Sequence, residues 1–186
     1  MIGGVRPIEH IPQGWAIGYI ALGSNQGDRL DKLSEAVFHL KSLPESKILA
    51  VSSAYETSPV GMPVGTRDFL NAVAKIVSAM PPHDLLVTCL GIERLMGRDR
   101  GLVVQDRPID LDLLHVDGVQ SSTRDLILPH PRAHVRSFVL IPWIEIEPGL
   151  TLYGARLEDW LEMLPEEEWT PCELAGTIPD YDESEM

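Results

Sequence analysis

Two aspartates, Asp110 and Asp112, stand two residues apart in the stretch 106–114 (DRPIDLDLL), which otherwise has the apolar residues of a buried strand. Successive side chains of a strand point to opposite faces, so the two carboxylates share one face. Two ionised carboxylates side by side repel each other and are costly to desolvate. Pairs of carboxylate oxygens suit Mg²⁺, which usually binds together with a substrate's phosphates. The spacing alone allows either a Mg²⁺ site or an edge strand with one wet face.

Arginines are concentrated around this stretch, whereas all four lysines precede residue 76. Seven arginines lie at positions 94, 98, 100, 107, 124, 132 and 136. Guanidinium groups match phosphate oxygens in bidentate geometry. The cluster therefore indicates a small anionic ligand, although surface helices also use arginine.

The length of 186 residues suits one well-packed domain rather than two. We expect a flexible arm over residues 1–14, a single domain over 15–164 and a mobile acidic tail over 165–186. Eight of the 28 acidic residues lie in this tail, which contains no base, so the rest of the chain has 20 acidic residues against 15 basic ones. The formal net charge of −13 disfavours nucleic-acid binding.

No apolar stretch reaches the length of about 18 residues that suggests a membrane span, and the first residues lack the apolar core of a signal peptide. Cys89 and Cys172 form no metal or redox motif. We therefore expect a cytoplasmic protein with no membrane or nucleic-acid partner.

The pattern of apolar residues predicts strands over residues 15–23, 48–55, 69–77 and about 109–114. One helix is expected over residues 30–43, a second from Pro82 to Gly97, and a short last helix around Trp160. This order is typical of a ferredoxin-like split βαβ core, an α+β fold with a mainly antiparallel sheet and helices packed on it. The connection 56–68 (ETSPVGMPVGTRD) is longer than a hairpin needs, which favours a functional loop.

Several short segments between residues 16 and 148 together resemble the 6-hydroxymethyl-7,8-dihydropterin pyrophosphokinase family. They are 21–25 (ALGSN), 52–61 (SSAYETSPVG), 69–72 (FLNA), 92–93 (IE), 97–98 (GR), 107–114 (RPIDLDLL), 128–132 (LPHPR) and 136–138 (RSF). Each segment is weak alone, but the ordered set is specific. The resemblance implies an enzyme of folate biosynthesis that transfers pyrophosphate from ATP to the pterin's hydroxymethyl group and releases AMP. We expect this enzyme to be a monomer.

On the ATP side, the resemblance implies that Asp110 and Asp112 bind two Mg²⁺ ions that bridge the ATP phosphates. The residues that it implies around ATP are Glu93, Arg98, Arg100, Arg107, His130 and Arg136. Arg98 and Arg107 are expected to be catalytic together with the two aspartates. Arg100 and Glu93 could instead be solvated, and His130 could be a turn residue.

On the pterin side, an amide such as that of Asn71 is costly in an apolar strand unless it is hydrogen-bonded, either to backbone or to a pterin edge. The residues that the resemblance implies around the pterin are Thr57, Pro59, Val60, Phe69, Asn71, Asp110 and Phe138. Phe69 and Phe138 would stack on the two faces of the ring, but either could instead be a core residue. The family usually has Tyr in place of Phe69, so an aromatic ring is retained.

The chain departs from the family at residues 104–106, where Val-Gln-Asp replaces the usual Trp-Gly-Pro, and the loop 98–107 is slightly short. In the family this loop closes over ATP, and such closure can limit turnover. An alternative reading is therefore a pterin- or nucleotide-binding homologue with impaired catalysis. A third reading, a ferredoxin-like interaction domain, does not explain Asp110, Asp112 and Asn71 together.

Overall fold

The computed structural model describes residues 11–99 and 106–181. Its longer elements are β1 (Ala16–Ser24), α1 (Arg29–Lys41), β2 (Ser46–Val51), β3 (Ala54–Thr57), β4 (Phe69–Ser78), α2 (Pro82–Leu95), β5 (Asp110–Val116), α3 (Ser137–Ile146), α4 (Leu157–Glu162) and β10 (Glu173–Gly176). The shorter ones are β6 (Ser121–Ser122), β7 (Ile127–Leu128), β8 (Thr151–Leu152), β9 (Ala155–Arg156) and the 3-10 turns Ala133–Val135 and Glu166–Glu168.

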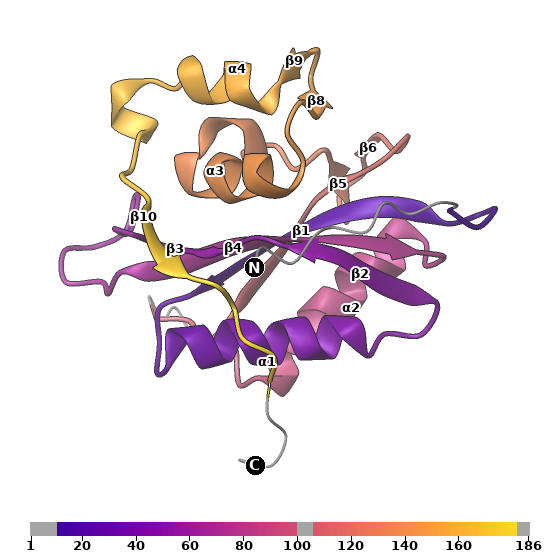
Figure 1. Ribbon diagram of the computed structural model, residues 1–186, viewed down its shortest axis with the longest axis horizontal. Coiled ribbons are helices and arrows are strands. Elements are labelled where there is room, and N and C mark those ends of the chain that lie inside the picture. Colours follow the sequence, from indigo (N-terminus) through magenta and orange to yellow (C-terminus); the bar gives the residue numbers. More distant parts are fainter. Residues whose placement is uncertain (1–10, 100–105, 182–186) are drawn as a thin grey trace.

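Helices cover both faces of a six-stranded antiparallel sheet (Figure 1). The strand order is β10-β3-β4-β1-β5, and β2 also pairs with β4. Helices α1 and α2 lie on one face, whereas α3 and α4 lie on the other, so a hydrophobic core forms on each side. The predicted ferredoxin-like α+β fold is confirmed. Over the described ranges, no helix has the length and apolar character needed to span a membrane.

Helix α1 begins and ends within two residues of the predicted bounds. The side chain of Asp28 accepts a hydrogen bond from the backbone N–H of Asp31, which caps the first turn. Leu33, Val37 and Leu40 are buried at the expected helical spacing and face the sheet. The sequence signals at both ends and along the apolar stripe are therefore local, and they predict this helix well.

The strand predicted over residues 48–55 is two strands, β2 and β3, which pair with different parts of β4. The break lies at Ser52, whose hydroxyl donates to the carbonyl of Ser53 and accepts from the backbone N–H of Val73. A side chain thus takes a place in the hydrogen-bond ladder that backbone groups would otherwise occupy. Both strands stay on the same edge of β4, but the chain bends between them.

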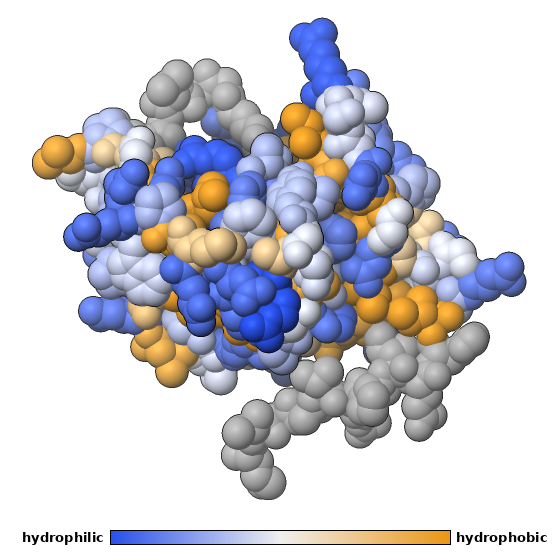
Figure 2. Space-filling view, turned by 90° about the horizontal axis from the view of Figure 1, so that it is seen from above, coloured by the Kyte–Doolittle hydropathy of each residue, from blue (hydrophilic) through white to orange (hydrophobic). Residues whose placement is uncertain are grey.

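The apolar run that follows Arg136 forms α3, the main helix on the second face of the sheet. Its Trp143 is fully buried, with its ring centroid 5.2 Å from that of Tyr19 in β1. Because nearly all residues of this run are apolar, its sequence showed no clear helical period. On the molecular surface above α3 and α4, hydrophobic residues form separate patches between hydrophilic ones (Figure 2).

The acidic segment 165–181, expected to be a mobile tail, lies against the body of the protein (Figure 1). Strand β10 pairs with β3 at the edge of the sheet, and Ile178 packs against the core that α1 and α2 cover. The hydroxyl of Ser34 donates to the carbonyl of Pro179 at 2.7 Å. The many acidic residues of this segment suggested disorder. Its backbone can nevertheless pair with the edge of the sheet while the acidic side chains remain in water.

Deleting residues 165–186 is expected to lower the melting temperature by about 5–10 °C. The deletion removes several hydrogen bonds and the contacts of Ile178, which together contribute on the order of 2–4 kcal/mol to the free energy of unfolding. Differential scanning calorimetry would measure the shift. The control is deletion of residues 182–186 alone, which removes no described contact. Equal melting temperatures for both deletions would mean that the packed segment adds nothing to stability.

Candidate active site

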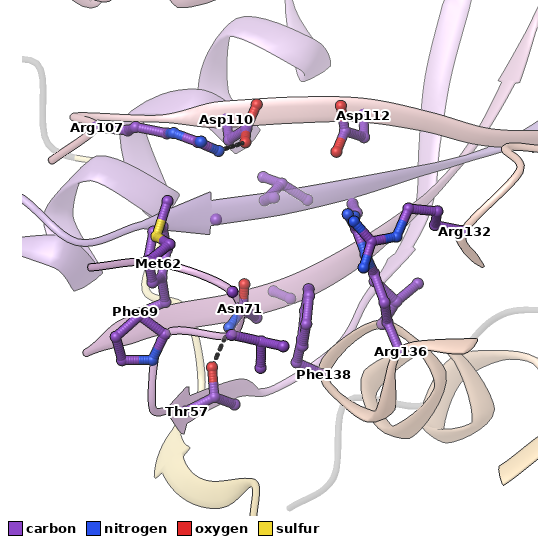
Figure 3. A pocket seen from close by; sticks show the side chains of 18 of the residues that line it. Thr57, Met62, Phe69, Asn71, Arg107, Asp110, Asp112, Arg132, Arg136 and Phe138 are labelled. Carbon is purple, nitrogen blue, oxygen red and sulfur yellow. Dashed lines mark hydrogen bonds and ion pairs between the residues drawn. The ribbon is translucent and has the colours of Figure 1, made fainter. Parts of the chain in front are cut away.

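A cavity of about 280 Å³ opens on the α3 side of the sheet, where the helix leaves the strand ends uncovered. This volume is near the lower end of ligand sites, which span roughly 300–1,000 Å³. Side chains from β4 and β5, the loop after β3, and the start of α3 converge on it (Figure 3). Asp110 and Asp112 form one wall, and Thr57 and Asn71 lie toward the other.

Strand register brings the polar residues of the cavity together. Gly23 of β1 is paired with Asn71 of β4 on one side and with Asp110 of β5 on the other. In the next row on this face, Ala21 is paired with Asp112. Since strand side chains alternate, these residues share the face on which Tyr19 and Leu114 pack in the α3 core. The prediction that Asp110 and Asp112 share a face is confirmed, because the intervening Leu111 is buried on the opposite side.

Two arginines hold Asp110 in its ionised form. Arg98 Nη1 donates to Asp110 Oδ1, and Arg107 Nη1 donates to Oδ2 at 2.6 Å. Burial alone would raise the pKa of Asp110, but the charges and hydrogen bonds of Arg98 and Arg107 outweigh it and the pKa is lowered. The carboxylate therefore faces the cavity as an anion at neutral pH.

Glu93 stabilises the Arg98–Asp110 ion pair without lining the cavity. Its side chain is only 1% exposed, and its Oε1 accepts hydrogen bonds from Arg98 Nη1 at 2.6 Å and from the backbone N–H of Leu111 at 2.8 Å. One carboxylate thus ties α2 to both Arg98 and β5. Neither Glu93 nor Arg98 lines the cavity, so their expected contacts with ATP remain predictions.

Asn25, which follows β1, holds the backbone of Arg107. Its Oδ1 accepts from the N–H of Arg107 at 2.6 Å, and its own N–H donates to the carbonyl of Arg107 at 3.2 Å. Its Nδ2 donates to Asp106 Oδ1 at 3.1 Å. Asp106, the last residue of the departure from the family, thus engages the amide of Asn25, while the guanidinium of Arg107 pairs with Asp110. Residues 104 and 105 of that departure lie outside the described residues.

The opposite end of the cavity combines an amide with aromatic rings. Asn71 Nδ2 donates to Thr57 Oγ1 at 2.7 Å, and both side chains are buried. Within the described ranges, no donor is hydrogen-bonded to Asn71 Oδ1, so this oxygen can accept from a ligand. Phe69 and Phe138 lie on either side of Asn71 (Figure 3). The arrangement suits a flat ring with hydrogen-bonding edges.

His130 and Arg136 lie at the Asp112 end. The backbone N–H of Arg132 donates to His130 Nδ1 at 3.2 Å, so a neutral imidazole carries its proton on Nε2. Burial lowers the pKa of His130, and Arg136 and Arg132 lower it further, although Asp112 acts in the opposite direction. A neutral ring with Nε2–H can donate a hydrogen bond to an anion.

Most of the predicted site residues converge on this one cavity. Those that line it are Thr57, Pro59, Val60, Phe69, Asn71, Arg107, Asp110, Asp112, His130, Arg136 and Phe138. Arg100 lies outside the described residues. Their contacts with substrates stay predictions, but their convergence from five separate segments is a property of the fold.

Gly23, Met62 and Arg132 are among the lining residues to which the sequence assigned no role. A Cβ at Gly23 would lie 3.1 Å from Asn71 Oδ1 and 3.8 Å from Phe69 Cδ1. Glycine inside a strand often marks such a close approach, and this signal was available in the sequence. Nothing in the sequence distinguished Met62 from its loop neighbours.

Comparison with known proteins gives a consistent result. A family model described as 7,8-dihydro-6-hydroxymethylpterin-pyrophosphokinase matches residues 19–148. A Methylorubrum extorquens protein named 2-amino-4-hydroxy-6-hydroxymethyldihydropteridine pyrophosphokinase is 40% identical over 146 residues, which cover 78% of this chain and 92% of that protein. A Bacillus subtilis protein of the same name is 42% identical over 130 residues, with 70% and 77% coverage.

Among solved structures, a crystal structure of Plasmodium falciparum HPPK-DHPS with pterin and p-hydroxybenzoate resembles this chain with a TM-score of 0.57. The identity is 13%, and the match covers 80% of this chain and 43% of that one. At this identity the likeness concerns the fold alone.

Replacing Glu93 by Gln is expected to lower the free energy of unfolding by about 2 kcal/mol. The loss is smaller than for a buried charge left without any partner, because Arg98 still pairs with Asp110. Urea unfolding followed by tryptophan fluorescence would measure the change. Asp180→Asn is the matched control, since it removes a carboxylate from an exposed ion pair with Lys41 and should have little effect. Equal stability of the two variants would contradict a structural role for Glu93.

Proposed function

The chain belongs to the 7,8-dihydro-6-hydroxymethylpterin-pyrophosphokinase family, and from this premise we propose how the residues of the cavity act. It is a diphosphotransferase of folate biosynthesis that transfers pyrophosphate from ATP to 6-hydroxymethyl-7,8-dihydropterin. In this reaction the hydroxymethyl oxygen bonds to the β-phosphorus of ATP, the bond from that phosphorus to the oxygen bridging the α-phosphate breaks, and AMP leaves. The hydroxyl proton is released.

The observation that carries the proposal is the row Asn71–Gly23–Asp110 across three strands. It puts a buried amide at one end of an uncovered sheet face and an ionised carboxylate at the other. The amide suits the donors and acceptors of a pterin edge, and the carboxylate suits a cation on ATP phosphates. The pterin's hydroxymethyl group would then point toward the ATP phosphates.

For the pterin, we assign the end of the cavity around Asn71. Asn71 would bind the ring edge, with its orientation fixed by Thr57. Phe69 and Phe138 would stack on the ring faces, and each such contact contributes about 0.5–1.5 kcal/mol beyond burial. Pro59 and Val60, in the loop after β3, would close the remaining side.

For ATP, we assign the end around Asp110 and Asp112. These two carboxylates fit Mg²⁺, which commonly binds one or two carboxylates and completes its shell with substrate phosphates and water. The described residues hold no cluster of three or more His, Cys, Asp or Glu side chains that could form a metal site without substrate. We propose that two Mg²⁺ ions bind at this end, where they would neutralise negative charge on the ATP phosphates.

The chain's own residues position the phosphates and balance their charge. Arg107 and Arg136 would bind phosphate oxygens, and His130 would donate from Nε2. Arg98 would reach the phosphates only by exchanging part of its contact with Asp110 and Glu93. Most of the rate acceleration would come from alignment of the hydroxymethyl oxygen with the β-phosphorus.

We propose a cytoplasmic monomer. Both cysteines are free thiols, Cys89 buried and Cys172 half-buried, as suits a reducing compartment. No observation on the described residues favours the alternative of impaired catalysis, because Asp106 leaves the Arg107–Asp110 pair in place.

The test is AMP release by the purified protein with Mg²⁺, ATP and 6-hydroxymethyl-7,8-dihydropterin, compared with reactions that lack the pterin or contain excess EDTA. Pterin- and Mg²⁺-dependent AMP is the expected result. Tight pterin binding without AMP would instead identify the impaired homologue.

Asp110→Asn is expected to lower kcat by roughly a thousandfold, about 4 kcal/mol of transition-state stabilisation, because the amide cannot bind Mg²⁺ as an anion. Pterin affinity, measured by isothermal titration calorimetry, should change little. A variant with near-normal turnover would contradict the metal assignment.

Gly23→Ala is expected to weaken pterin binding by about tenfold, because the new methyl group crowds Asn71 Oδ1 and displaces the ring edge that it binds. The matched control is Gly18→Ala in the same strand, whose Cβ would meet Ile76 and Leu85 of the opposite core. Calorimetric titration with pterin separates the two variants. Unchanged affinity in Gly23→Ala would place the ring elsewhere.

A further inference from the structure

Arg132 is a cavity residue to which the site described above gives no role. Its side chain is 54% exposed, lines the cavity, and approaches Arg136 on the wall nearest Asp112 (Figure 3). It stands four residues before Arg136, and the 3-10 turn Ala133–Val135 between them brings both side chains to the same opening. Two guanidinium groups therefore face one space from adjacent positions.

This pair of like charges lacks a full complement of anions. In the part of the chain that the structure describes, Arg136 forms no ion pair, and its buried Nε has no hydrogen-bond partner. Burial lowers the pKa of Arg136, and the nearby charge of Arg132 lowers it further, although the charges of Asp112, Asp110 and Glu168 act in the opposite direction. Two adjacent cations repel each other unless an anion lies between them. A polyphosphate that spans both guanidiniums would remove this repulsion and bind more tightly than to either alone.

The only ion-pair partner of Arg132 on the described residues is Glu168, in the short turn Glu166–Glu168 after α4. Arg132 Nη2 lies 3.9 Å from Glu168 Oε2, the outer limit of an ion pair, and this buried oxygen has no hydrogen-bond partner. The contact is therefore weak enough to be exchanged for a better one. Glu168 also lies outside the residues 19–148 that match the family.

We propose that Arg132 binds the phosphates of ATP together with Arg136, and that Glu168 is the counter-charge that Arg132 leaves when ATP binds. The proposal rests on the function assigned above. Arg132 is then a binding residue, and Glu168 is a positioning residue that opposes nucleotide binding. A carboxylate near a phosphate site lowers its affinity for anions, so Glu168 would set the affinity for ATP without touching the pterin.

The experiment measures binding of an ATP analogue with a carbon in place of the α,β-bridging oxygen, in the presence of Mg²⁺, by isothermal titration calorimetry. Arg132→Ala should raise its Kd about tenfold, as expected for loss of a charge-assisted hydrogen bond. Arg132→Lys should recover part of this loss, because it keeps the charge but not the fork. Pterin Kd and melting temperature should stay at the wild-type values.

Glu168→Gln should lower the Kd of the same analogue about twofold to threefold, consistent with the modest energy of exposed ion pairs. In the Arg132→Ala background this effect should largely disappear, since the two side chains act on each other. A merely structural role for Glu168 would instead weaken binding or lower the melting temperature.

The matched control is Arg94→Ala, which removes an exposed arginine of α2 on the opposite face of the sheet and should leave ATP affinity unchanged. Equal ATP affinity in Arg132→Ala and the wild type would overturn the assignment of Arg132. Weaker binding in Glu168→Gln would overturn the role of Glu168. If the wild type neither binds the analogue nor releases AMP, the proposed function itself fails, so the two failures are distinguishable.

Discussion

The register of β4, β1 and β5 is the constraint on which the site depends. Gly23 stands between Asn71 and Asp110, so an amide and a carboxylate face the same space from different strands. Because strand side chains alternate, a shift of one residue would turn both groups into the α1–α2 core. The backbone hydrogen bonds that hold the sheet together therefore also set the distance between the two proposed substrates.

Charge balance explains why a carboxylate can lie on this partly covered face. Asp110 is stabilised by Arg98 and Arg107, and Arg98 is in turn held by the buried Glu93. Removing a charge from water is costly unless its partners are already in place. The network supplies these partners before any ligand arrives, and it leaves the carboxylate ionised for a cation. The site that we propose for Mg²⁺ and phosphates is thus, without a ligand, an internally compensated set of charges.

Coverage of the sheet by α3 separates core from cavity on a single face. The helix buries Tyr19, Val73 and Leu114, whereas the ends of the same strands stay uncovered. The segment after α4, which lies outside the residues 19–148 that match the family, also contacts the wall of the cavity. Thr170 exchanges two hydrogen bonds with Ser137, which stands between Arg136 and Phe138, so this segment braces one wall of the cavity.

Local patterns in the sequence determined much of this protein. The alternation around Asp110 and Asp112 predicted their shared face, and the apolar stripe over residues 30–43 predicted α1, because both depend on neighbours only a few residues away. Ordered motifs predicted the family and most of the residues that line the cavity. Tertiary structure alone decided that Glu93 is buried behind the site, that Asp106 engages Asn25, and that the acidic segment adds a strand to the sheet. It also brought Arg132 beside Arg136 and Glu168. These outcomes depend on which groups become neighbours when distant segments pack, and a charged side chain's partner cannot be read from its own position in the chain.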